Sequence, residues 1–388
     1  MTRLTVHEYA AGLRHRYRMA TKGVKKRILD EFCQTTGMHR KAAIRLLGRS
    51  SGPAPLRRGR PRRYGPEVAE ALVELWEVGD RMCGKLLAAV MPELLGALER
   101  HGELKVTPEV RELLLAVSPS TIDRLLRRQR LPRLRQPRRQ SPATTTLKSQ
   151  IPIRTWSEWK GARPGSVQAD LVLHCGERTE GFYLTTLCTV DVASSWTEVQ
   201  PVWGIGQQRV GGAMHDIHRR LPFPLKALHT DNGSEFINRT LYSWCSRRGI
   251  QFTRGRGYHK NDQAYVEERN WLSVRRHVGY DRYNSQKAFE LLHQLYPLLT
   301  ALNFFRPVRK LVGKQRLGAK VVKRYDEPQT PYRRLLASGV LSEPARVALE
   351  KRFLALNPAQ LQRRIDQLLR QLWESAERPA TRGVSRVG

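Results

Sequence analysis

The chain has 388 residues, of which 69 are lysine or arginine and 35 are aspartate or glutamate, giving a formal net charge of +34 at pH 7. Hydrophobic residues make up 40% of the sequence, which excludes a disordered protein. The length predicts two or three globular domains. No apolar run approaches the roughly 20 residues that a membrane-spanning helix needs, so we expect no membrane partner.

The positive charge is clustered, which indicates a polyanionic partner rather than general solubility. Residues 124–139 contain eight arginines, and no acidic residue lies between Asp123 and Glu158. Such clusters are typical of proteins that bind nucleic acid. Five scattered cysteines without a CxxC pair indicate reduced thiols. With no apolar signal core at the N-terminus, they predict a cytoplasmic, DNA-associated protein.

Residues 1–56 have the pattern of a helix-turn-helix domain. The stretch "KGVKKRILDEFCQTTG" has apolar residues on one helix face, Gly37 interrupts it, and "HRKAAIRLLGR" resumes helical spacing. In a helix-turn-helix the second helix can lie in the major groove of DNA. An ordinary helical hairpin is the alternative interpretation. If the domain binds DNA, Arg40 and Arg45 are its expected contacts.

Residues 57–65, "RRGRPRRYG", have no apolar pattern and favour an extended segment. Arginines in an extended arm can enter the narrow, electronegative minor groove of DNA. A plain linker is the alternative. We expect Arg58, Arg60 and Arg62 to contact DNA.

Residues 66–131 predict a second helical DNA-binding domain. In "SPSTIDRLLRR", Ser118 is placed to cap a helix and Pro119 occupies its first position. A preceding helix makes this the second helix-turn-helix candidate, with Arg124, Arg127 and Arg128 as the expected DNA contacts. Residues 132–150, rich in Pro, Arg, Ser and Thr, predict a basic tether.

After residue 150 the period changes from helical to β, and strands and helices alternate. We predict a meander of three antiparallel strands, followed by a helix, a strand, a helix, a strand and a last helix. Their expected ranges are 167–175, 181–190, 195–203, 207–220, 225–230, 237–248, 250–255 and about 263–277.

Three carboxylates occupy distinctive positions in this layout. Asp170 lies inside the first strand, where a charge is costly unless it is paired or bound to a metal. Asp231 directly follows the fourth strand, and Glu267 lies on the last helix, with 35 residues between it and Asp231. On the proposed topology the first and fourth strands are neighbours and the last helix packs across their ends, so all three can converge. Carboxylates are ligands for Mg²⁺, and two such ions can support phosphodiester transfer.

The sequence Asp231-Asn232-Gly233 has two interpretations. It makes a common turn, since Asp and Asn bond their own backbone and Gly tolerates left-handed conformations. Alternatively, the turn presents the Asp231 side chain to a site. Asp170 upstream and Glu267 downstream favour the second interpretation.

Four segments together resemble the integrase core of retroviral-type integrases and bacterial insertion-sequence transposases: "ADLV", "TVDVASSWTEV", "HTDNGSEF" and "YHKNDQAYVEERN". The resemblance covers roughly residues 166–306 and implies an RNase H-like α/β catalytic core with a mixed five-stranded sheet. It also implies that Asp170, Asp231 and Glu267 form a metal-binding DDE triad for two Mg²⁺ ions, for which Mn²⁺ can substitute. Lys260 would belong to the active-site loop.

The resemblance implies a DNA transposase that cleaves transposon ends and joins their 3′-hydroxyls to target DNA. Its partners would be double-stranded DNA and at least one further copy of the chain, because an element has two ends. A catalytically inactive DNA-binding protein and a nuclease of the same fold are the alternatives. Glu268 directly follows Glu267, so the residues alone leave two candidates for the glutamate. Helical periodicity of 100° per residue places Glu267 on one face with Trp271 and Val274, which favours Glu267 as the inward-facing residue.

The predicted fold class is therefore multidomain. Its parts are an N-terminal all-α region (1–56 and 66–131), a catalytic core (151–306) and a basic C-terminal region (307–388). Apolar spacing within 343–377 predicts terminal helices that dock on another domain or subunit. We expect Asp191 to cap a turn. Core positions are expected for Trp196, Trp203, Trp244 and Trp271.

Overall fold

The computed structural model describes residues 2–48, 63–129, 161–256 and 263–377. The chain forms two compact units, Met1–Arg63 and Tyr64–Gly388, so the first boundary falls inside the predicted arm. The tether at 132–150 lies outside the described residues.

The smaller unit consists of α1 (Arg3–Met19), α2 (Lys22–Thr36) and α3 (Arg40–Leu47). As predicted, Gly37 ends α2: its φ of 68° is left-handed, and its N–H bonds the carbonyl of Cys33. The helices enclose a small core of their own. Its fully buried members include Ala10, Phe32, Ala43 and Leu47.

The larger unit begins with four helices, α4 (Pro66–Val78), α5 (Gly84–Arg100), α6 (Pro108–Leu115) and α7 (Pro119–Leu125). The predicted cap is confirmed, because the Ser118 side chain accepts a hydrogen bond from the Thr121 N–H. Asp123 on α7 accepts a 2.8 Å hydrogen bond from the backbone N–H of Gly84 at the start of α5. The second helix pair is thereby tied to its neighbour.

A mixed five-stranded sheet follows, with strand order β3-β2-β1-β4-β5. β1 pairs with β2, and β2 with β3, in antiparallel fashion, whereas β1–β4 and β4–β5 are parallel. The predicted meander and the neighbouring first and fourth strands are therefore confirmed. The strands are β1 (Ser166–Leu173), β2 (Thr185–Asp191), β3 (Thr197–Val202), β4 (Ala227–Thr230) and β5 (Gln251–Arg254).

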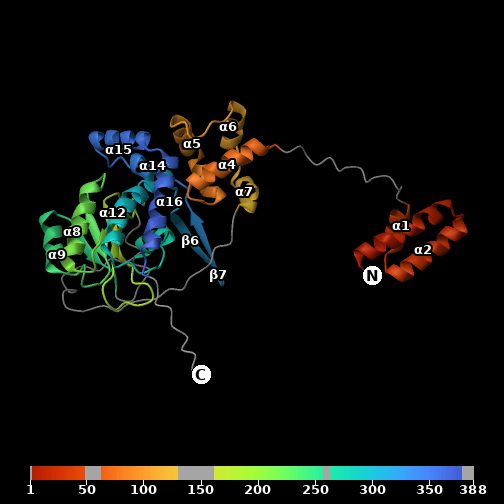
Figure 1. Ribbon diagram of the computed structural model, residues 1–388, viewed down its shortest axis with the longest axis horizontal. Helices are drawn as coiled ribbons and strands as arrows, with labels where there is room; N and C mark the ends of the chain where they lie inside the picture. The colour runs from red at the N-terminus through yellow and green to blue at the C-terminus, as the bar shows by residue number, and fades with distance from the viewer. Residues whose placement is uncertain (1, 49–62, 130–160, 257–262, 378–388) are drawn as a thin grey trace, which may run out of the picture. The chain divides into compact units, whose positions relative to one another are not determined.

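Helices cover both faces of this sheet. One core includes Val167 and Ala169 of β1 with residues of α8 (Gln207–Arg220) and α9 (Arg239–Arg247), which lie beside each other in Figure 1. A second core joins Val172 and Val199 to α12 (Gln286–Thr300) and α16 (Pro358–Glu374). The predicted docking of the terminal helices is confirmed for α16, which packs on α12 (Figure 1).

Between α12 and α16 the chain forms elements that the sequence analysis did not predict. A hairpin of β6 (Leu311–Leu317) and β7 (Lys320–Tyr325) turns at Gly318, whose φ of 60° is left-handed. The helices α13 (Leu302–Phe305) and α14 (Pro331–Ala337) were not predicted either, whereas α15 (Glu343–Ala355) lies within the predicted helical range 343–377.

Charged contacts hold α4–α7 against the rest of the larger unit. Asp80, between α4 and α5, forms ion pairs with Arg276 and Arg306. Glu103, after α5, pairs with Arg363 of α16 at 2.7 Å. These contacts join segments about 200 residues or more apart in sequence.

Two smaller predictions had different outcomes. Asp191 does cap a turn, accepting hydrogen bonds from the Ser194 N–H and from the Gly165 N–H. Trp196 is buried, but the core prediction for Trp271 is wrong, because 41% of that residue is exposed. Among the described helices, none is both long and apolar enough to span a lipid bilayer.

Candidate active site

Asp170 and Asp231 come from neighbouring parallel strands at the same level. Gln168 of β1 pairs with His229 of β4, and each aspartate lies two residues further along its strand direction. Neighbouring strands are about 4.8 Å apart, and side chains two residues apart share a face. Sheet geometry therefore places the two carboxylates side by side.

The segment that carries Glu267 runs across the same face of the sheet. It comprises α10 (Ala264–Arg269), a π-helical stretch η5 (Asn270–Arg275) and α11 (Arg276–Val278). The N–H of Val266 donates to the Gln168 side chain at 3.2 Å, and Asn270 Nδ2 donates to Asp170 Oδ2 at 2.6 Å. These two bonds fix the helix over β1, beside Asp170.

The electrostatic environment of Asp170 reflects this arrangement. Burial raises the pKa of its carboxyl to about 7, and the negative charges of Asp231 and Glu267 act in the same direction. Hydrogen bonds from Asn270 and from the Leu171 N–H, which stabilise the charged form, oppose the rise in pKa. The three predicted site residues therefore lie close enough to influence one another.

Glu267 and Glu268 differ in the groups that they face, although both side chains are exposed. The charge of Glu267 acts on Asp170, whereas that of Glu268 acts on Arg269 and Tyr265. This geometry favours Glu267 as the partner of the aspartates.

The helical periodicity that the sequence analysis used for these glutamates does not hold along the whole segment. Counting 100° per residue placed Trp271 on an inward face, but it is exposed. The stretch Asn270–Arg275 is π-helical, and a π-helix has more residues per turn than an α-helix. π-Helical turns are frequent at functional sites.

In the turn after β4, the Asp231 side chain stabilises the turn and is oriented by it. Asp231 Oδ1 accepts a 3.0 Å hydrogen bond from the Gly233 N–H, which is a typical Asx turn. Asn232 is tied to the next strand, since its Nδ2 donates to the Gly255 carbonyl at 2.8 Å and its Oδ1 accepts from Arg254. The two interpretations of this sequence are therefore compatible.

Three residues near the site were missed by the sequence analysis: Gln168, Glu235 and Asn270. Glu235 packs so closely against Gly233 that a Cβ there would lie 2.4 Å from its carboxylate. Burial raises the pKa of Glu235, and Asp231 contributes to the rise. Two signals were available in the sequence: the two-residue period of β1 relates Gln168 to Asp170, and Asn270 lies one helical turn after Glu267.

The donor chemistry of the site fits a hard divalent cation, because carboxylate oxygens are the ligands that Mg²⁺ prefers. Asn270 Oδ1 is also buried beside Asp170 without a hydrogen-bond donor from the described residues. Within residues 2–48, 63–129, 161–256 and 263–377, however, no three His, Cys, Asp or Glu side chains are arranged to hold one ion. Lys260 of the predicted loop lies outside these ranges.

The predicted DNA-contacting arginines that the structure describes lie at the surface. Arg40 forms an ion pair with Asp30, and both side chains are exposed. Arg45, Arg124 and Arg127 are exposed as well. The side chain of Arg128, and Arg58, Arg60 and Arg62 entirely, lie outside the described part of the chain.

The chain is similar along most of its length to a protein of Sinorhizobium fredii (strain NBRC 101917 / NGR234) called "Uncharacterized protein y4rM". The two sequences are 42% identical over 328 residues, which are 84% of this chain and 94% of the relative. The chain belongs to the same family. No protein-family model matches it. The shared region is long enough to require most of the larger unit, so the relative should have the same mixed sheet.

Proposed function

We propose that this chain is a DNA transposase that cleaves the ends of its element and joins their 3′-hydroxyls to target DNA. One observation carries the proposal. Asp170 lies on β1, Asp231 directly follows the neighbouring parallel strand β4, and the charge of Glu267 acts on Asp170.

The sheet supports the finer proposal of an RNase H-like core. Its first three strands are antiparallel, and the first is followed on its other side by two parallel strands. That order agrees with the fold that the sequence resemblance implies. It brings a mid-strand residue of β1 next to the residue that follows β4.

We propose Asp170, Asp231 and Glu267 as the ligands of two Mg²⁺ ions, which when bound would activate the attacking oxygen and stabilise the leaving oxygen. Hydrogen bonds within the chain orient the two aspartate carboxylates. Asn270 and the Leu171 N–H each hydrogen-bond one oxygen of Asp170, which fixes its carboxylate and favours its charged form. The Asx turn at Gly233 fixes Asp231 in the same way.

DNA binding is assigned to the helical and arginine-rich regions before residue 150. The net charge of +34 supports a polyanionic partner, and the exposed Arg45, Arg124 and Arg127 lie on or directly after the second helix of each pair. Because an element has two ends, we expect at least a dimer when both are held. We expect the protein to act on cytoplasmic DNA.

The direct test is cleavage and strand transfer on DNA that carries the element's ends, with Mg²⁺ or with EDTA. Asp170→Asn and Asp231→Asn should each lower activity by at least about 100-fold, since each removes a charged ligand that has no obvious substitute. Binding of end DNA should stay within about twofold of wild type. Retained activity in either variant would remove that residue from the site.

The same assays separate the alternatives. A DNA-binding protein without catalytic activity would give no Mg²⁺-dependent product with the wild-type chain. A simple nuclease would cut DNA but would fail to join pre-cut ends to a target.

A further inference from the structure

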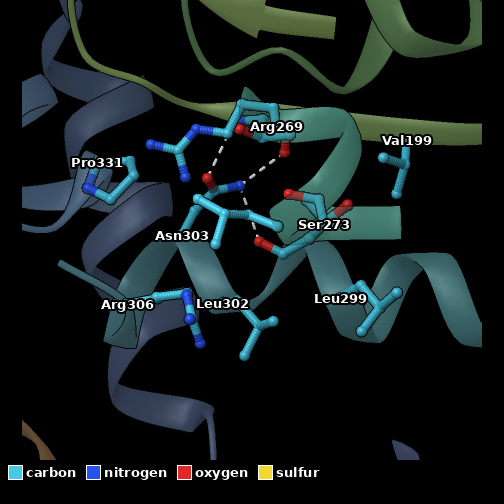
Figure 2. A pocket seen from close by; sticks show the side chains of 11 residues that line it. Val199, Arg269, Ser273, Leu299, Leu302, Asn303, Arg306 and Pro331 are labelled. Atoms are coloured by element: carbon cyan, nitrogen blue, oxygen red, sulfur yellow. Dashed lines mark hydrogen bonds between the residues drawn. The ribbon is translucent and has the colours of Figure 1, made fainter. Parts of the chain in front are cut away.

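A pocket that none of the three carboxylates lines lies beside β3 (Figure 2). It is lined by residues of β3, the end of α10, the π-helical stretch, α12, α13 and the start of α14. Its cavity volume is about 20 Å³, and the pocket is partly open to solvent. Its polar lining includes Thr197, Arg269, Ser273, Thr300, Asn303 and Arg306.

Arg269 is the unusual member of this pocket. Only 6% of the residue is exposed. Among the described residues, none accepts a hydrogen bond from its guanidinium or forms an ion pair with it. The nearby charge of Glu268 acts on Arg269 without a salt bridge between them. The described part of the chain therefore supplies no counter-ion for this mostly buried charge, and such a charge costs free energy unless water or a bound group neutralises it.

Neighbouring arginines show how the fold treats such groups elsewhere. Arg306 lines the same pocket but forms an ion pair with Asp80. Arg334 pairs with Asp326 at 2.7 Å. Of these three arginines, only Arg269 has no counter-ion among the described residues.

The other polar groups of the pocket differ in whether they already form hydrogen bonds. Asn303 is fully engaged: its Oδ1 accepts from the Thr197 N–H at 3.0 Å, and its Nδ2 donates to the carbonyls of Thr197 and Thr300 at 2.8 Å (Figure 2). Ser273 lies about one turn after Arg269 and contributes a hydroxyl to the same pocket. A donor pair of guanidinium and hydroxyl suits an acceptor-rich anion.

We propose that this pocket binds an oxyanion, either inorganic phosphate or a phosphate group of DNA, through Arg269 and Ser273. The planar guanidinium presents paired N–H donors that match the oxygens of phosphate. The proposal concerns binding alone and holds whether or not the chain is a transposase.

The test follows thermal unfolding of the full chain during titration with inorganic phosphate at constant ionic strength. Phosphate should raise the Tm of wild type by at least about 2 °C more than that of Arg269→Met, since a ligand stabilises the state that binds it. Ser273→Ala should give an intermediate shift. Arg370→Gln, which removes an exposed arginine of α16, should respond like wild type.

Without phosphate, Arg269→Met should unfold at or above the wild-type Tm, because it removes an unpaired buried charge. A large loss of Tm in that buffer would show that the protein itself already pairs Arg269, and would overturn the proposal. Equal phosphate shifts in wild type, Arg269→Met and Ser273→Ala would do the same.

Duplex DNA distinguishes the two sources of the anion. If saturating DNA abolishes the Arg269-dependent phosphate shift, a backbone phosphate occupies the pocket. If the shift persists with DNA bound, the ligand is the free anion. Either result supports the oxyanion site, whereas a phosphate shift that is independent of Arg269 contradicts it.

Discussion

The two helix-turn-helix candidates look alike in sequence but are held in different ways. The pair α2–α3 belongs to a small unit with its own core of residues such as Phe32 and Leu47. The pair α6–α7 belongs to the larger unit, where Asp123 bonds the start of α5 and Asp80 pairs with Arg276 and Arg306. Helix periodicity and caps predict the pair but do not show what the pair packs against.

This difference bears on function. The α4–α7 bundle makes ion pairs with the segment that carries Glu267, through Asp80 and Arg276. DNA bound at α7 would therefore contact a body that is continuous with the candidate active site. The first pair can recognise DNA without such a link, because its core is local.

Breaking the ion pairs of Asp80 should have the largest effect of these changes, a loss in the free energy of unfolding. Asp80→Asn leaves two mostly buried guanidinium groups without a full counter-charge, which typically costs about 3–5 kcal/mol. Asn tolerates the left-handed φ of 55° at this position, so the backbone is matched. Urea unfolding measures the change. The control is Glu99→Gln, which breaks the more exposed pair with Arg111 and should cost less than about 1 kcal/mol. Similar losses for both would deny that Asp80 anchors the bundle.

Removing residues 2–63 should have the next largest effect. We expect the affinity for end DNA to fall by about 100-fold at fixed salt, with a smaller salt slope, because arginine contacts to phosphate are lost. The Tm of the remaining unit should change little, since the two units are separate. Unchanged end binding, measured by fluorescence anisotropy, would assign end recognition to the larger unit.

Acid pH should unfold the two units differently. Burial and, to a smaller extent, the charge of Arg275 lower the pKa of His174 from 6.5 to about 3. Its Nε2 lies 2.7 Å from the Thr186 hydroxyl, among buried tyrosines. Below pH 6.5 the unfolded chain takes up a proton that the folded chain does not. The contribution of His174 to the stability of the larger unit should therefore fall as pH drops from 6.5 towards 3, whereas the raised pKa of Asp170 acts in the opposite direction.

The smaller unit is the internal control for this pH effect, since His7, His15 and His39 are exposed. His174→Gln should flatten the pH dependence of unfolding of the larger unit, even if it lowers stability at pH 7. An unchanged slope in that variant would show that another group causes the loss.

Much of the sheet and of the candidate site could be predicted from local patterns. Asp170 and Asp231 were placed correctly relative to β1 and β4, because strand periods and turn residues are local signals. That β1 and β4 are neighbours was predicted from the proposed order of strands and helices. The cap at Ser118 and the turn role of Asp191 were also confirmed.

Other features depend on contacts that no local pattern reports. The π-helical stretch at Asn270–Arg275 changes which residues share a face, and Trp271 was misplaced for that reason. The ion pairs of Asp80 join segments that are far apart in sequence, and the burial of Arg269 also depends on distant segments. In a sequence with many charged residues, nothing distinguishes these two residues from exposed ones. The hairpin turn at Gly318 had a usable signal, a glycine between two strand-like runs.

Strand transfer by two adjacent glutamate variants tests the proposed site most directly. Glu267→Gln and Glu268→Gln are compared with wild type on pre-cut end DNA in Mg²⁺, so that neither cleavage nor end recognition limits the reaction. Each variant loses one exposed carboxylate, and the two positions are adjacent on the same helix. Of these two glutamates, only Glu267 acts on Asp170. The account predicts at least about a 100-fold loss of strand transfer for Glu267→Gln and less than about threefold for Glu268→Gln. Loss of strand transfer in the second variant but not in the first would contradict it.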